Sequence, residues 1–108
     1  MSVFKDVNDF HTKYNQPNYQ LTQFADNDIY DSEEISYMNF RLDFVEEELL
    51  EFGEAYNERN AVEMVAECMD LIYVAVGLLS AIGLSPEQSQ LHWDELQKCN
   101  MKKIATPS

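Results

Sequence analysis

The chain has 108 residues and a formal net charge of −13, from 20 acidic and 7 basic residues. Its 45% hydrophobic content, with six Phe and six Tyr, is enough for the core of one domain spanning residues 1–108. The negative charge repels nucleic acid and anionic membranes, so it argues against a nonspecific DNA- or RNA-binding protein.

The two cysteines, Cys68 and Cys99, have neither the spacing of a disulfide scaffold nor that of a zinc site. No signal peptide is recognisable, and the apolar run over residues 71–82 is too short to span a bilayer. We therefore expect a cytoplasmic protein with free thiols and no membrane partner.

The first predicted helix follows Ser2, a residue type that caps helix N-termini. Apolar side chains recur at helical spacing from Val3 to Tyr14, and Pro17 limits how far this helix continues. His11 belongs to this pattern and is predicted to be packed or at the surface, because His is uncommon in Mg²⁺ sites. The next stretch, residues 16–31, is polar with interspersed aromatic and aliphatic side chains, which predicts an ordered loop.

Capping patterns predict three further helices, over residues 31–59, 60–83 and 85–103. Asp31 and Asn60 are each followed three residues later by Glu, which is the pattern of a capping box. Ser85 precedes a Pro at the first helical position and a Gln at the third, the strongest start signal in the chain. No segment alternates like a strand. The sequence therefore predicts an all-α bundle with short turns after residues 59 and 83.

The second predicted helix carries a cluster of acids. Glu47 and Glu51 lie about 40° apart around the helix axis, and Glu48 and Glu51 about 60° apart, so three carboxylates point one way. An apolar stripe on another side lets the helix pack while these acids face a neighbour; it consists of Leu42, Val45, Leu49, Phe52 and Tyr56.

The third predicted helix is almost wholly apolar except for one acidic stripe, so we expect it to be buried on every other side. Glu63, Glu67 and Asp70 share an arc of about 60°. A carboxylate in such a segment costs several kcal/mol to bury unless it is compensated, and a bound cation is the favoured compensation here. If the two acidic helices pack antiparallel, four or five carboxylates converge. Such ligands suit Mg²⁺ or Mn²⁺, ions that accompany phosphate substrates.

The apolar surface of the third helix exceeds what the other helices of one small chain can cover. We therefore expect self-association, as a homodimer or a dimer of dimers.

Three sequence motifs resemble those of the MazG-like all-α nucleoside triphosphate pyrophosphohydrolases, and the layout is most similar to phosphoribosyl-ATP pyrophosphohydrolase relatives of bacteria and phages. The first is Phe10-His11-x-Lys13-Tyr14 near the N-terminus. The second is the acidic pattern Glu48-x-x-Glu51 followed by Glu67-x-x-Asp70-Leu71-Ile72-Tyr73. The third is Asn100-Met101-Lys102-Lys103-Ile104. These motifs stand in the expected order over most of the chain.

This resemblance implies an enzyme that hydrolyses a (deoxy)nucleoside triphosphate to the monophosphate and pyrophosphate. By the same resemblance, Mg²⁺ (with Mn²⁺ as a substitute) binds to Glu48, Glu51, Glu67 and Asp70. Glu47 then orients or deprotonates the attacking water. Asn100 and Lys103 are implied to contact the nucleotide. Tyr73, one turn beyond Asp70, is a further candidate for phosphate contact, although core packing explains it equally well. Relatives assemble with their sites near subunit interfaces, which agrees with the expected self-association.

Two other classes of protein remain open. One is a non-catalytic helical module of the same fold that only oligomerises or binds metal; the intact acids argue against it. The other is a di-iron bundle, which needs Glu-x-x-His pairs that this sequence lacks.

Overall fold

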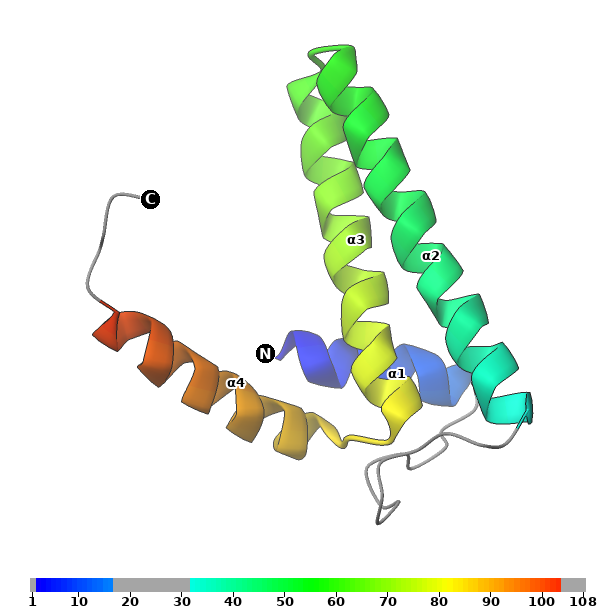
Figure 1. Ribbon diagram of the computed structural model, residues 1–108, viewed down its shortest axis with the longest axis vertical. Helices are drawn as coiled ribbons and strands as arrows, with labels where there is room; N and C mark the ends of the chain where they lie inside the picture. The colour runs from blue at the N-terminus through cyan, green and yellow to red at the C-terminus, as the bar shows by residue number, and fades with distance from the viewer. Residues whose placement is uncertain (1, 17–31, 104–108) are drawn as a thin grey trace.

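The computed structural model describes residues 2–16 and 32–103, and within these residues it contains four α-helices and no strand (Figure 1). The helices are α1 (Val3–Lys13), α2 (Ser32–Asn57), α3 (Ala61–Ile82) and α4 (Pro86–Lys102). The all-α prediction is confirmed. The ordered loop predicted over residues 16–31, and the cap predicted at Asp31, lie outside the described residues except for Gln16.

The predicted caps form as expected. The side chains of Ser2 and Asn60 each accept a hydrogen bond from the backbone N–H three residues ahead, at 3.4 and 3.1 Å. Ser85 and Gln88 exchange reciprocal hydrogen bonds of 3.1 and 2.9 Å at the start of α4. Gly83 ends α3 in the left-handed conformation, with φ of 110°. Local sequence therefore explains where α1, α3 and α4 begin and where α3 ends.

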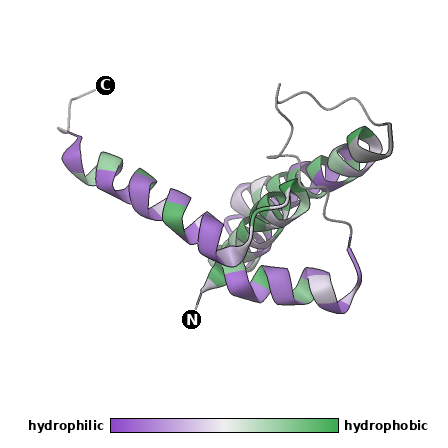
Figure 2. Cartoon of the chain, turned by 90° about the horizontal axis from the view of Figure 1, so that it is seen from below, coloured by the Kyte–Doolittle hydropathy of each residue, from purple (hydrophilic) through white to green (hydrophobic). Residues whose placement is uncertain are grey.

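The helices are arranged around an antiparallel hairpin. Helices α2 and α3 run side by side, α1 crosses their lower end against α3, and α4 projects away from the pair (Figures 1 and 2). Phe4 of α1 meets Trp93 of α4 edge-on, with 6.1 Å between ring centroids. The radius of gyration is 16.2 Å, whereas a compact domain of this length has about 13 Å. A single copy of the chain is thus less compact than a typical domain of its length.

The core of a single chain is small. Among the described residues, the buried apolar side chains are Phe4, Val7, Ala55 and Ala81. The expectation that α3 is buried on all sides except its acidic stripe is wrong for one copy of the chain, since Val62, Val65 and Met69 are 79%, 60% and 62% exposed. The apolar stripe of α2 is also largely uncovered, for Leu42, Leu49 and Tyr56 are all about half exposed. Figure 2 shows apolar ribbon concentrated on the α2–α3 hairpin and polar ribbon prevailing on α4.

Helix α3 also has a mean hydropathy of 1.8 over an 18-residue window, and its 22 residues are long enough to cross a membrane. The whole helix is therefore longer and more apolar than the run over residues 71–82 alone indicates. Length and composition alone support it, and core helices of soluble proteins meet the same criterion.

Candidate functional site

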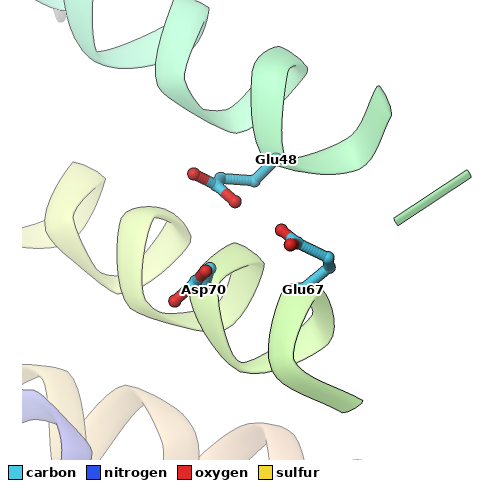
Figure 3. A group of neighbouring side chains, drawn as sticks. All are labelled: Glu48, Glu67 and Asp70. Carbon is cyan, nitrogen blue, oxygen red and sulfur yellow. The ribbon is translucent and has the colours of Figure 1, made fainter. Parts of the chain in front are cut away.

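The acidic motifs of α2 and α3 meet at the middle of the hairpin. Glu48 points from α2 toward Glu67 and Asp70 of α3 (Figure 3). The acids of each motif, Glu48 with Glu51 and Glu67 with Asp70, are three residues apart, about one helical turn. Both members of each motif therefore project from the same side of their helix. Antiparallel packing then places the two sides face to face, as the spacing predicted.

These three carboxyl groups are close enough to share a cation. One oxygen from each of Glu48, Glu67 and Asp70 lies within 4.8 Å of the other two. Oε2 of Glu48 and Oε2 of Glu67 are buried and have no hydrogen-bond partner within the structure. In the part of the chain described, the ion pairs join Lys5 with Asp9 and Lys98 with Glu95, so none reaches this cluster. Unpartnered hard oxygen ligands of this kind fit Mg²⁺ or Mn²⁺.

The electrostatics of the cluster are those of crowded like charges. Burial, followed by the charge of Glu51 and a hydrogen bond with it, raises the pKa of Glu48 to about 7, and the charges of Asp70 and Glu67 add to this. Hydrogen bonding to Glu51 is the leading cause that raises the pKa of Glu67, ahead of burial and the charges of Glu51 and Asp70. Glu51 thus influences both pKa values and lines a hollow together with Glu67, but it is not one of the three residues whose oxygens lie within 4.8 Å of one another. A divalent cation would relieve their repulsion.

The acidic surface continues toward the tip of the hairpin. A hollow of about 380 Å³ lies beside the cluster, and it is lined by Glu51, Glu54, Ala55, Glu58, Glu63 and Glu67. An anionic ligand at this hollow would face five glutamates, so cations that screen their charge would favour its binding.

Glu47, predicted to orient or deprotonate the attacking water, lies on a different face of α2 from Glu48, so the expectation that it points the same way is wrong. It is exposed and lines a shallow hollow with Phe40, Asp43 and Phe44. It is adjacent in sequence to Glu48, but it does not belong to the group of close carboxylates.

Tyr73 lies on the side of α3 that faces α1. Its ring meets Phe10 edge-on at 5.6 Å between centroids, and it lines an apolar hollow with Val7 and Ile72 among others. In one copy of the chain, packing therefore describes Tyr73 better than phosphate contact does.

Asn100 and Lys103 lie at the far end of α4. The backbone N–H of Lys103 donates to the carbonyl of Asn100 at 3.2 Å, which closes the helix. Because α4 projects away from the hairpin, the two side chains are not brought to the acidic cluster of the same chain (Figure 1).

Sequence reasoning missed a second polar group, which joins α1 to the hairpin. Nη2 of Arg41 lies 3.0 Å from Nε2 of His11, and both side chains are buried. Packing of His11 is confirmed, but its buried partner was not foreseen. The available signal was spacing: Arg41 stands seven residues before Glu48, and Gly77 seven residues after Asp70, so the two layers share one register of the antiparallel pair.

The family model for phosphoribosyl-ATP pyrophosphohydrolase matches residues 8–100. The chain belongs to this family. The match spans α2, α3, the acidic cluster between them and most of α4, so the predicted membership of the MazG-like all-α superfamily is confirmed. Comparisons with curated proteins and with solved structures find no significant match. Phosphoribosyl-ATP pyrophosphohydrolases act on a phosphoanhydride of a nucleotide, which places this chain among pyrophosphohydrolases with a nucleotide-like substrate.

Proposed function

We propose that the protein is a Mg²⁺-dependent pyrophosphohydrolase that cleaves a (deoxy)nucleoside triphosphate between its α and β phosphates. The products are the nucleoside monophosphate and pyrophosphate. The observation that carries this proposal is the meeting of Glu48, Glu67 and Asp70, with ligand oxygens within 4.8 Å of one another, between two helices of a pyrophosphohydrolase family.

The carboxylates of Glu48, Glu51, Glu67 and Asp70 hold the cation in this proposal. When bound, Mg²⁺ or Mn²⁺ neutralises charge on the phosphates and makes a water molecule more acidic. Burial is the main cause that raises the pKa of Glu48, and hydrogen bonding to Glu51 is the main cause for Glu67; repulsion among the carboxylates adds to both, and a bound cation would relieve that repulsion. The carboxylates also repel a nucleotide that arrives without metal, which couples substrate binding to metal binding.

Glu47 remains the candidate general base for the attacking water. Its carboxylate is exposed and lies one residue from the cluster, so a substrate seated on the cluster can come within its reach. We expect Glu47→Gln to lower kcat about 100-fold, within the range for loss of a general base, while Mn²⁺ affinity stays at the parent value. Equal losses of kcat and of Mn²⁺ affinity would instead make Glu47 a ligand.

A product assay tests the reaction. The protein is incubated with Mg²⁺ and a panel of ribo- and deoxynucleoside triphosphates, together with phosphoribosyl-ATP, and the products are separated. Monophosphate plus pyrophosphate from a nucleoside triphosphate supports the proposal. Diphosphate plus orthophosphate would refute the bond assignment, and cleavage of phosphoribosyl-ATP alone would refute the substrate class.

Matched controls accompany this assay. Excess chelator removes the cation and is expected to abolish product release. Glu48→Gln should behave in the same way, whereas Glu46→Gln changes an exposed acid of the same helix and should leave the rate unchanged. Binding of Mn²⁺ without turnover of any nucleotide in the panel would favour the second candidate, a non-catalytic metal-binding or oligomerisation module.

We also propose that the working unit is a homodimer or a dimer of dimers in the cytoplasm, without membrane or nucleic acid partners. The exposed apolar residues of α2 and α3 supply the surface for a second copy. Asn100 and Lys103 then serve the acidic cluster of a neighbouring copy, since α4 does not bring them to its own. Light scattering is expected to give at least a dimer at micromolar concentration, and sedimentation with liposomes should leave the protein in solution.

Mixing two impaired variants tests the shared site at nucleotide concentrations below KM. Glu67→Gln removes a metal ligand, and Lys103→Ala weakens nucleotide binding. If the two residues of one site come from different copies, an equimolar mixture that has exchanged subunits forms some intact sites and is more active than the sum of the separate variants. If the exchanged mixture shows only that sum, the site is built within one chain.

A further inference from the structure

The buried pair of Arg41 and His11 is an unusual feature of the described chain. Arg41 of α2 is 7% exposed and His11 of α1 is 4% exposed, with 3.0 Å between Nη2 and Nε2. In the described residues no carboxylate forms an ion pair with Arg41. Nε of Arg41 and Nδ1 of His11 are also buried without a hydrogen-bond partner. A charge buried in this way weakens a fold more often than it stabilises it.

The rings of α2 partly compensate this charge. The guanidinium carbon of Arg41 lies 5.3 Å from the ring centroid of Phe44 and 6.0 Å from that of Tyr37. Such contacts favour a cation over a ring face, but they are weaker than a carboxylate partner. They hold the guanidinium in one place, and that place is the surface of α3.

Gly77 is the point of α3 that receives the pair. A Cβ at position 77 would lie 2.7 Å from Nη2 of Arg41 and 3.1 Å from Nε2 of His11. A side chain there requires the guanidinium of Arg41 to shift from its observed position. The other helical glycine of the hairpin, Gly53, has nothing within 4 Å of a Cβ. The missing side chain at position 77 thus lets three helices meet at one spot.

This contact has the same register as the carboxylate cluster. Arg41 packs on Gly77 one seven-residue step from the layer in which Glu48 faces Asp70. Seven residues correspond to about 10.5 Å of helix, or two turns. Over so short a distance helices behave as stiff rods, so the separation of α2 and α3 at one layer determines it at the next.

We propose that Arg41, His11 and Gly77 form a helix clamp that positions Glu48 against Glu67 and Asp70 for cation binding. The three are positioning residues, because they act on the ligands through the spacing of α2 and α3. The clamp rests on the proposed function insofar as the cation is the one used in catalysis. Cation binding itself can be measured without any nucleotide.

The experiment measures Mn²⁺ affinity by electron paramagnetic resonance of the free ion, with circular dichroism to establish that each variant is folded. Gly77→Ala is expected to weaken Mn²⁺ binding on the order of tenfold, comparable to the loss of an outer-shell partner. Gly53→Ala makes the same chemical change in open space and should bind as the parent does. Ala81→Gly weakens the same helix without adding a side chain next to Arg41, so it should lower the melting temperature and leave Mn²⁺ affinity unchanged.

A double-mutant cycle identifies Arg41 as the mediator. An Arg41→Lys background lacks Nη2, the atom of Arg41 that a Cβ at position 77 would approach most closely. Gly77→Ala should therefore weaken Mn²⁺ binding less in this background than in the parent. Equal losses in the two backgrounds would overturn the role of Arg41. Parent-like binding by folded Gly77→Ala would overturn the clamp. If Gly77→Ala does not fold, Arg41→Lys and His11→Gln are judged by the same criterion, a several-fold loss of affinity in a folded protein.

The outcomes for the clamp and for the proposed function are distinct. If the parent binds Mn²⁺ and the clamp variants bind equally well, the clamp alone is wrong. If the clamp variants lose affinity but no nucleotide is hydrolysed, the clamp stands and the proposed enzyme does not. If the parent does not bind Mn²⁺, both are overturned.

Discussion

Site residues were predicted on both the α2–α3 hairpin and helix α4, but the structure brings together only those of the hairpin. The hairpin brings Glu48, Glu67 and Asp70 together as their spacing indicated. Helix α4 begins at its predicted cap, yet it carries Asn100 and Lys103 away from that cluster. Periodicity along a helix tells which side chains share a face. It does not tell which other helix or which molecule that face meets, so the direction of α4 does not follow from it.

The largest effect is expected from the hairpin. Glu67→Gln removes one ligand while it preserves the shape of the side chain, and we expect kcat to fall about 100-fold or more. Without metal, this variant should melt at the parent temperature or above it, because one repelling charge is gone. Rate assays and thermal melts with and without Mg²⁺ measure both quantities. A large loss of stability at every metal concentration would mean that Glu67 forms an ion pair with a basic side chain of the protein.

A smaller effect is expected from α4. Lys103→Ala should raise KM for the nucleotide about tenfold with kcat largely retained, as for loss of one charged hydrogen bond to phosphate. Initial rates over a range of nucleotide concentrations give both constants. Lys98→Ala is the matched control, since Lys98 is exposed on the same helix and pairs with Glu95. Equal KM values for parent and Lys103→Ala would remove α4 from the site altogether.

The pH dependence of stability isolates the hairpin from the rest of the chain. The pKa of Glu48 is raised to about 7 in the folded state, so between its ordinary value and pH 7 the folded protein binds more protons than the unfolded one. The metal-free protein should therefore lose stability as pH rises through this window. Glu48→Gln should show a smaller loss, because Glu67 also has a raised pKa and retains its part of it, and saturating Mg²⁺ should offset the loss in the parent. Urea unfolding at pH 5 and pH 8 compares the two proteins.

His11 acts in the opposite direction and needs its own control. Burial, followed by the charge of Arg41, lowers the pKa of His11. Its contribution to stability is therefore complete above the ordinary value of 6.5 and is lost as pH falls below it. His11→Gln removes this acid-side loss and leaves the contribution of Glu48 visible. If stability still rises with pH in His11→Gln, the assignment to Glu48 is wrong.

The smallest effect is expected at the start of α4. Ser85→Ala removes the side-chain half of the capping box and should cost about 1 kcal/mol of unfolding free energy. Mn²⁺ affinity should stay at the parent value, because the hairpin keeps its own contacts. Urea denaturation and a Mn²⁺ titration test this separation, and a parallel loss of both would show that α4 supports the cluster after all.

The parts that could be predicted from sequence depend on nearby residues. The caps at Ser2, Asn60 and Ser85 each join residues three apart, and they formed as predicted. The acidic cluster required one further assumption, that adjacent helices joined by a short turn pack antiparallel. This assumption holds for α2 and α3.

The parts that could not be predicted depend on distant residues. Arg41 and His11 are thirty positions apart, and no short-range sequence pattern predicts that a charged side chain will be buried against a glycine of another helix. Tyr73 was left open between packing and phosphate contact, and its contact with Phe10 depends on where α1 crosses α3. The exposed apolar faces were foreseen as an excess of apolar surface, but sequence does not say which helices remain uncovered.

The left-handed turn at Gly83 makes α4 a lever arm. The helix has 17 residues, which corresponds to about 25 Å, so a rotation of about 20° at its base would carry its far end through about 9 Å. The two backbone torsion angles of Gly83 thus contribute to the direction of α4 and to where Asn100 and Lys103 lie. A side chain at position 83 would strain the observed φ of 110° and would change the direction of α4, although no residue near Asn100 or Lys103 is altered.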